Sequence, residues 1–244
     1  MGNVGIIMRR ELASYFATPL AYVFIFIFLV LANAFTYYLG GFYEHGQADL
    51  DAFFTFHPWL YLFLIPAIAM KLWAEERKSG SIELLMTMPV TLWEAVLGKY
   101  LAAWIFTALA LALTFPLWIT VNYLGKPDNG TILAAYLGSL LLAGGFLAIG
   151  SCMSALTRNQ VVAFILGVVA CFVFLLAGFP LVLDLFKGWA PQPLIDAIAS
   201  LSFLTHFESI VKGVIDVRDL LYFAMLIGFF LLATVIALDL RKAD

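Results

Sequence analysis

The residues best suited to specific chemistry lie in one short segment, 74–90, which reads AEERKSGSIELLMTMPV. It opens with four consecutive charged residues, Glu75, Glu76, Arg77 and Lys78, in a chain that is 64% hydrophobic and only 12% charged. Neighbouring acidic and basic side chains can form charge-paired contacts with a protein partner. They can equally belong to an amphipathic helix that rests on lipid headgroups. The residues alone leave both interpretations open.

Capping and turn residues indicate that this segment is structured. Nothing interrupts a helix before Gly80, so we expect a rigid helical extension of the apolar run that precedes it. Gly80 permits a sharp turn, and Ser81 can then cap a second short helix with Glu83 in its first turn. A capping box over 91–94 starts the helix that follows. A connection that only joins two helices needs about 2–8 residues, so we expect a compact module over 71–91.

The chain shows no pattern typical of an ATP-binding or catalytic site. A P-loop needs GxxxxGK[ST], so that backbone N–H groups and the lysine hold the phosphates. Gly98 and Lys99 are followed by tyrosine, and the Gly-Lys pair at 125–126 is followed by proline. The three histidines have no metal-ligand spacing, and the net charge of −3 gives no reason to expect a nucleic-acid partner. We therefore predict no catalytic residue, metal or cofactor in this chain.

The composition is that of an integral membrane protein. Soluble domains are about 45–50% apolar and about 25% charged, and here the apolar excess is concentrated in long runs without charges. A spanning helix needs about 20 such residues. We predict an all-α protein with a single transmembrane domain over 1–244 and six spans, at about 19–39, 58–73, 95–123, 132–156, 160–183 and 219–239.

The placement of lysine and arginine predicts the orientation of these spans. Six spans put both termini on one side, and that side would carry nine of the 13 basic residues. The larger positive charge marks the cytoplasm. We therefore expect both termini, and the 71–91 module between the second and third spans, to be cytoplasmic.

The N-terminal segment is predicted to lie along the membrane surface. Over 3–17, apolar residues recur at helical spacing while Arg9, Arg10 and Glu11 occupy other faces, which is typical of an interfacial helix. Thr18 and the proline after it would end this helix and cap the first span.

The connection between the last two spans is long and is not purely polar. We expect short outer re-entrant helices over about 191–212, where prolines break the chain. Thr205, His206, Phe207 and Glu208 fit a capping box that would start one of these helices.

Three segments resemble a known family, the ABC-2 type transporter permeases. EERKSGSIELLMTMPVTLWEAVLGK resembles the family signature, in which an acidic pair, a Gly-Ser/Thr turn, a glutamate and a leucine-rich stretch precede a proline. RRELASYFATPLAYV and THFESIVKGVIDVRDLLYF resemble the N-terminus, and the segment before the last span, of the gliding-motility branch. The permeases of nitrous oxide reductase copper maturation are close relatives.

The resemblance implies that the 71–91 segment is a coupling helix on which a separate nucleotide-binding ATPase, holding ATP and Mg²⁺, docks. It implies that the helix at 3–17 is the family's elbow helix. It also implies a second six-span membrane subunit, either identical or a relative with a periplasmic domain, in the bacterial inner membrane. The residues that match the coupling signature are Glu75, Glu76, Arg77, Gly80, Ser81 and Glu83. On this basis we expect a non-catalytic permease subunit of an ATP-driven exporter.

Two other classes of function are weighed against this one. A membrane-embedded enzyme would need ionisable residues within the spans, where they are costly and mark function, yet the apolar runs carry no charged residue. The same observation argues against an ion-coupled transporter or channel that works without an ATPase. Asn33, Asn122 and hydroxyl groups could still line a pore in such a protein.

Overall fold

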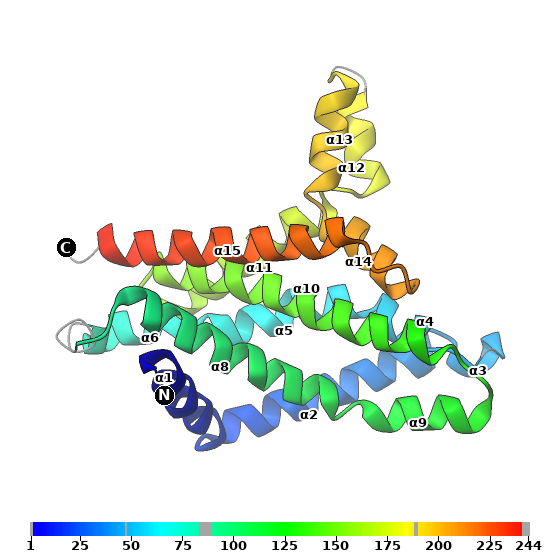
Figure 1. Cartoon of the computed structure of the whole chain (residues 1–244), viewed down its shortest axis with the longest axis horizontal. Coiled ribbons are helices and arrows are strands. Elements are labelled where there is room, and N and C mark those ends of the chain that lie inside the picture. Colours follow the sequence, from blue (N-terminus) through cyan, green and yellow to red (C-terminus); the bar gives the residue numbers. More distant parts are fainter. Residues whose placement is uncertain (1, 47, 83–88, 188–189, 241–244) are drawn as a thin grey trace.

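The computed structural model describes residues 2–46, 48–82, 89–187 and 190–240, and all regular structure within them is helical (Figure 1). In chain order the elements are α1 (Asn3–Phe16), α2 (Pro19–Ala34), the π-helical turn η1 (Phe35–Leu39), α3 (Phe42–His45), α4 (Asp51–Thr55), α5 (His57–Ala69), α6 (Lys71–Ser79), α8 (Leu92–Ala112), α9 (Phe115–Leu124), α10 (Asn129–Ala155), α11 (Gln160–Leu176), α12 (Pro180–Lys187), α13 (Gln192–Ser200), α14 (Phe203–Val211) and α15 (Val217–Leu240). The predicted all-α class is confirmed.

The described residues contain four helical stretches long and apolar enough to cross a membrane, Pro19–Leu39, Leu92–Leu124, Asn129–Ala155 and Val217–Leu240. The pair α13 and α14, bent by 62°, would make a fifth if it were counted as one span. The spans predicted at 58–73 and 160–183 are shorter than expected. A break divides the first into α5 and α6, and α11 ends the second at Leu176. Six spans are therefore not confirmed by helix length and composition.

The helix α10 forms the centre of the bundle, with α5, α8, α11, α14 and α15 packed around it (Figure 1). A stripe of small residues lets these neighbours approach closely. At Gly144, for example, an added Cβ would lie 2.9 Å from the hydroxyl of Tyr100 and 3.0 Å from Nε1 of Trp104. The remaining members of the stripe, Ala148, Ser151 and Ala155, are all buried. The stripe therefore serves packing inside the bundle.

The helix α1 lies at an angle to the long helices, at the same end of the bundle as α6 and the C-terminal end of α15 (Figure 1). It packs against α8 through Ile7, which is buried. Gly98 of α8 lies opposite and has no room for a side chain, because an added Cβ would lie 2.8 Å from the Cβ of Ile7. Asn3 Nδ2 also donates to Glu94 Oε1 at 3.0 Å. The helix predicted at 3–17 is present and is held by protein contacts.

Of the two helix caps predicted near this end of the bundle, one forms the expected hydrogen bonds and the other does not. The capping box at 91–94 is complete, since the Thr91 hydroxyl accepts from Glu94 N and the Glu94 carboxylate accepts from Thr91 N at 2.8 Å. Thr18 occupies the N-cap position of α2, but its hydroxyl donates to Tyr15 O at 3.0 Å and makes no cap bond.

The predicted capping box in the outer segment is wrong by three residues. The helix α14 starts earlier because Ser202 is its N-cap: this hydroxyl accepts from Leu204 N at 3.2 Å and donates to Leu175 O at 3.1 Å. Thr205 therefore lies inside the helix. Glu208 is exposed and pairs weakly, at 4.0 Å, with the lysine four residues later. The hairpin of α12 and α13 projects from the side of the bundle (Figure 1).

Gly98→Ala is expected to loosen the docking of α1 on α8, because the added methyl would overlap Ile7. Overpacking of this kind costs about 1–3 kcal/mol, so the thermal unfolding midpoint of the detergent-solubilised protein should fall. Gly228→Ala is the matched control, since a Cβ there meets no atom within 4 Å and alanine favours a helix. Equal midpoints for the two variants would contradict the close approach.

Candidate functional site at the α6 junction

The helix α6 begins at a break in the helical chain, between Ala69 and Lys71. A hydroxyl from α10 fills this break. The Oγ of Ser154 accepts from the backbone N–H groups of Trp73 and Ala74 at 3.1 Å each and donates to Met70 O at 2.9 Å. A side chain inserted into the backbone ladder is a recognised cause of kinks. The expected rigid extension is therefore a jointed one.

Two further contacts fasten α6 along the last turns of α10. Trp73 is fully buried, and its Nε1 donates to Ser151 Oγ at 3.0 Å. One turn later, a guanidinium N–H of Arg77 donates to Ala155 O at 2.6 Å. A basic side chain is favourable there because the last carbonyls of a helix lack intrahelical partners.

A buried lysine connects α6 to α8 and α1. The side chain of Lys99 in α8 is only 4% exposed, and its Nζ lies 2.6 Å from Glu76 Oε1 and 3.5 Å from Glu11 Oε1. The ammonium also lies 5.2 Å from the ring centroid of Trp73, within the range of a cation–π contact. Opposite charges this close and this sheltered from water hold the three helices in register.

The predicted acidic pair is divided between two faces of α6. Glu76 points inward to Lys99 and is engaged within the chain. Glu75 is exposed, as is Lys78 one turn later. Adjacent residues on a helix do not share a face, so only Glu75 of this pair is open to a partner.

The turn after α6 forms as predicted. Gly80 ends the helix with a φ of 75°, a left-handed conformation that glycine adopts without strain. Ser81 is exposed, and its Oγ lies 2.9 Å from that of Ser79 across the turn. Glu83, the remaining predicted coupling residue, lies outside the described residues.

The three charged residues predicted for the elbow helix have different surroundings. Arg9 and Arg10 are exposed. Glu11 faces Lys99, and its carboxylate also accepts a hydrogen bond from the Arg10 guanidinium at 3.0 Å. This helix therefore contributes one carboxylate to the α6 junction and leaves both arginines for headgroups or solvent.

At the far end of the bundle, His206 joins three outer elements. Its Nδ1 lies 2.6 Å from Asp219 Oδ1 at the start of α15, and its Nε2 lies 3.0 Å from Ser200 O at the end of α13. The ring stacks on Tyr222 with centroids 4.0 Å apart. Through these contacts His206, which lies in α14, connects that helix to the end of α13 and the start of α15.

A second histidine is buried in the bundle, and no motif in the sequence pointed to it. His57 is fully buried, and its Nδ1 lies 2.5 Å from Ser139 Oγ, which also lies 2.9 Å from the Tyr61 hydroxyl. The rings of Phe53 and Phe54 enclose it at centroid distances of 4.4 and 5.1 Å. Among the described residues, its Nε2 has no hydrogen-bond partner.

Comparison with protein families decides the class of this chain. The model of the ABC-2 family of transporter proteins matches residues 6–240. The chain belongs to the ABC-2 transporter family. A comparison with curated proteins finds no match. As an ABC-2 protein, the chain is a non-catalytic, multi-pass membrane subunit of an ABC transporter. Membership of this family implies an ATPase partner.

Sequence reasoning missed the residues that connect α6 to the rest of this ABC-2 subunit. The sequence patterns assigned no structural role at α6 to Ser151, Ser154 or Lys99. Two serines one turn apart at the end of an apolar run were a possible signal. Their partner Trp73 lies about 80 residues earlier, and a single sequence does not show that pairing.

Ser154→Ala in the ABC-2 subunit should destabilise the joint, because the N–H groups of Trp73 and Ala74 lose their acceptor inside the protein. An unsatisfied buried group costs about 1–3 kcal/mol, so we expect a lower thermal midpoint and faster hydrogen–deuterium exchange in α6. Ser200→Ala is the control, since that serine is exposed and lies outside α6 and α10. Unchanged exchange in α6 would show that the hydroxyl does not hold the joint.

Lys99→Met should destabilise the subunit by about 3–5 kcal/mol, because it leaves buried carboxylate charge uncompensated. Adding Glu76→Gln should recover part of this loss, which a double-mutant cycle of unfolding midpoints would measure. Lys78→Met, at an exposed position of the same module, should have little effect. Strictly additive effects of the two changes would argue against the ion pair.

Proposed function

We propose that this chain is the permease subunit of an ATP-driven exporter and that a separate ATPase docks on the 71–91 segment. Family membership supports the subunit, and the geometry of α6 is the observation that carries the docking site. Its inner face is bonded to α10, α8 and α1, while Glu75 and Lys78 are exposed at one end of the bundle. An anchored helix with an exposed charged face suits a partner that must both bind and push.

A push on α6 would reach the bundle by two routes. One leads through Ser151 and Ser154 into α10, and the other leads through Glu76 and Lys99 into α8 and α1. Packed interfaces switch between discrete arrangements and do not deform continuously. The joint at Met70 would let α6 change its angle while these contacts carry the movement. ATP and Mg²⁺ would be held by the ATPase, so this chain needs no cofactor.

We further propose that α5 with α6, and α11, form the second and fifth of six spans. The helix α11 is apolar over its 17 residues, and α5 continues into α6 across the bridged joint. Six crossings would place both termini in the cytoplasm of a bacterial inner membrane, as the basic residues predict. The bent pair of α13 and α14 would then enter the outer leaflet as the re-entrant element.

The transporter would contain a second six-span subunit, identical or related, with one ATPase on each copy. The segments over 9–23 and 205–223 support the gliding-motility branch of the family, in which the related subunit would carry a periplasmic domain. The relationship to the copper-maturation permeases rests on the same resemblance.

The alternative is an ion-coupled transporter or channel without an ATPase. His57 is the kind of buried ionisable group that such a mechanism would use. Its ring, however, is enclosed by aromatic side chains and is 0% exposed. Since the ring is closed off from solvent in the part of the chain that the structure describes, we favour the ATP-driven exporter.

Charge reversal on the exposed face of α6 tests the docking site. The chain would be co-purified with its cognate ATPase, and Glu75→Lys or Lys78→Glu should weaken association by about tenfold at low salt, because rim charges govern encounter. Glu208→Lys is the control, an equal change at an exposed site at the other end of the bundle. Membrane insertion should be intact in all variants. Unchanged association and ATP-driven transport would refute docking on α6.

A further inference from the structure

A cavity of about 530 Å³ lies between α1, α2, α5 and α6, next to the joint. It has two chemically different ends. Most of its wall is apolar and includes Phe24, Ile27, Leu64 and Ile68, while its remaining wall carries hydroxyl and charged groups of α1 and α6. Its volume lies in the range of small-molecule sites, about 300–1,000 Å³. A site with this division fits an amphiphile.

At the charged end of the cavity, one cation and one anion make no ion pair with any other residue that the structure describes. Glu11, Glu76 and Lys99 also line it, but these two carboxylates are paired within the buried cluster, both with Lys99 and Glu11 also with Arg10. Lys71 and Glu75 are left, four residues apart on α6 and therefore on one face. Within the described part of the chain, neither makes a hydrogen bond or an ion pair. This face is complementary to a headgroup that carries both charges.

Two hydroxyl groups at this end indicate where the ammonium and the phosphate of a headgroup would lie. Ser14 Oγ donates to Glu11 O at 2.7 Å and Thr18 Oγ1 donates to Tyr15 O at 3.0 Å. With their protons committed, both oxygens present only lone pairs, and a hydroxyl oxygen keeps two. The cavity thus offers acceptors from α1 and from the N-cap of α2, and a carboxylate from α6, for an ammonium group. Lys71 remains for a phosphate.

We propose that this cavity binds one zwitterionic phospholipid with an ammonium headgroup from the leaflet at the α6 end. The phosphate pairs with Lys71, the ammonium is accepted by Glu75 and the two hydroxyls, and an acyl chain lies along the wall of α2 and α5. The lipid would be in contact with the helix on which the ATPase is proposed to dock, but its binding does not require the ATPase.

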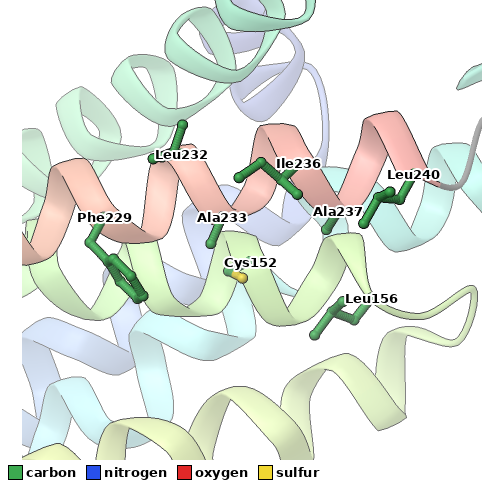
Figure 2. Close-up of a pocket in the computed structure, with 8 residues that line it drawn as sticks. All are labelled: Cys152, Leu156, Phe229, Leu232, Ala233, Ile236, Ala237 and Leu240. Carbon is green, nitrogen blue, oxygen red and sulfur yellow. The ribbon is translucent and has the colours of Figure 1, made fainter.

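A second cavity, which has an apolar lining, shows why charged lining residues are needed to select a headgroup. It measures about 470 Å³ and lies between α10 and α15, where Figure 2 shows Cys152 and Leu156 facing the side chains of α15 from Phe229 to Leu240. Its lining residues are apolar apart from the cysteine thiol. It can take up acyl chains, but among the described residues that line it none carries a charge that would distinguish one headgroup from another.

Native mass spectrometry of the purified full-length chain, without ATPase, tests the proposal. The protein would be titrated with phosphatidylethanolamine, phosphatidylcholine or phosphatidylglycerol in detergent. We expect one phosphatidylethanolamine to be retained most strongly, because its ammonium donates hydrogen bonds, and phosphatidylglycerol least. Equal retention of phosphatidylglycerol and phosphatidylethanolamine, or no retained phosphatidylethanolamine, would overturn the proposal.

Variants locate the bound lipid. Lys71→Gln and Glu75→Gln should each lower phosphatidylethanolamine retention by about tenfold, the loss of one charge-assisted contact. Lys78→Gln, which does not line the cavity, is the matched control. Ala67→Phe should fill the apolar wall and abolish the preferential retention of phosphatidylethanolamine, with folding verified by circular dichroism. Retention unchanged in Lys71→Gln and Glu75→Gln, or a preference persisting in Ala67→Phe, would show that the lipid binds elsewhere.

Discussion

Backbone groups inside a membrane have no water to pair with, and this constraint accounts for most of the structure. Wherever the long helices are interrupted, a hydroxyl supplies a bond. Ser154 bridges the joint of α5 and α6, and Thr114 donates to Leu111 O at 2.6 Å where α8 gives way to α9. Ser202 caps α14 and bonds the end of α11 at once. At these three joints, therefore, a hydroxyl takes the place of water.

The ionic cluster at the α6 junction positions helices more than it stabilises the fold. Removing charges from water is expensive, and a well-packed apolar replacement is often as stable as a buried ion pair. The cluster is therefore weak evidence for stability. The cluster fixes the relative position of three helices, because Lys99 contacts carboxylates on two other helices and the face of one aromatic ring at the same time. We interpret it as the element that keeps α1, α6 and α8 moving together.

The predictions that succeeded depended on contacts close in sequence. The capping box at 91–94 and the turn at Gly80 involve neighbouring residues, so the chain fixes them wherever it lies. The box at 205–208 failed because Ser202 competes for the same helix start and gains a second bond, to Leu175, which is 27 residues earlier. The predicted span at 58–73 was interrupted for a similar reason, since Ser154 offers its backbone another partner.

The sequence by itself determined that this is a helical membrane protein, where its charged module lies, and which family it belongs to. The first two properties follow from composition, from runs of apolar residues and from local capping, all of which act over a few residues. The family follows from the resemblance of three segments and from the family match over residues 6–240. The tertiary structure decided that Glu76 is engaged and Glu75 is exposed, that α6 is jointed, and that a two-ended cavity lies beside it. Helical periodicity establishes which residues share a face, but only packing determines which neighbour that face meets.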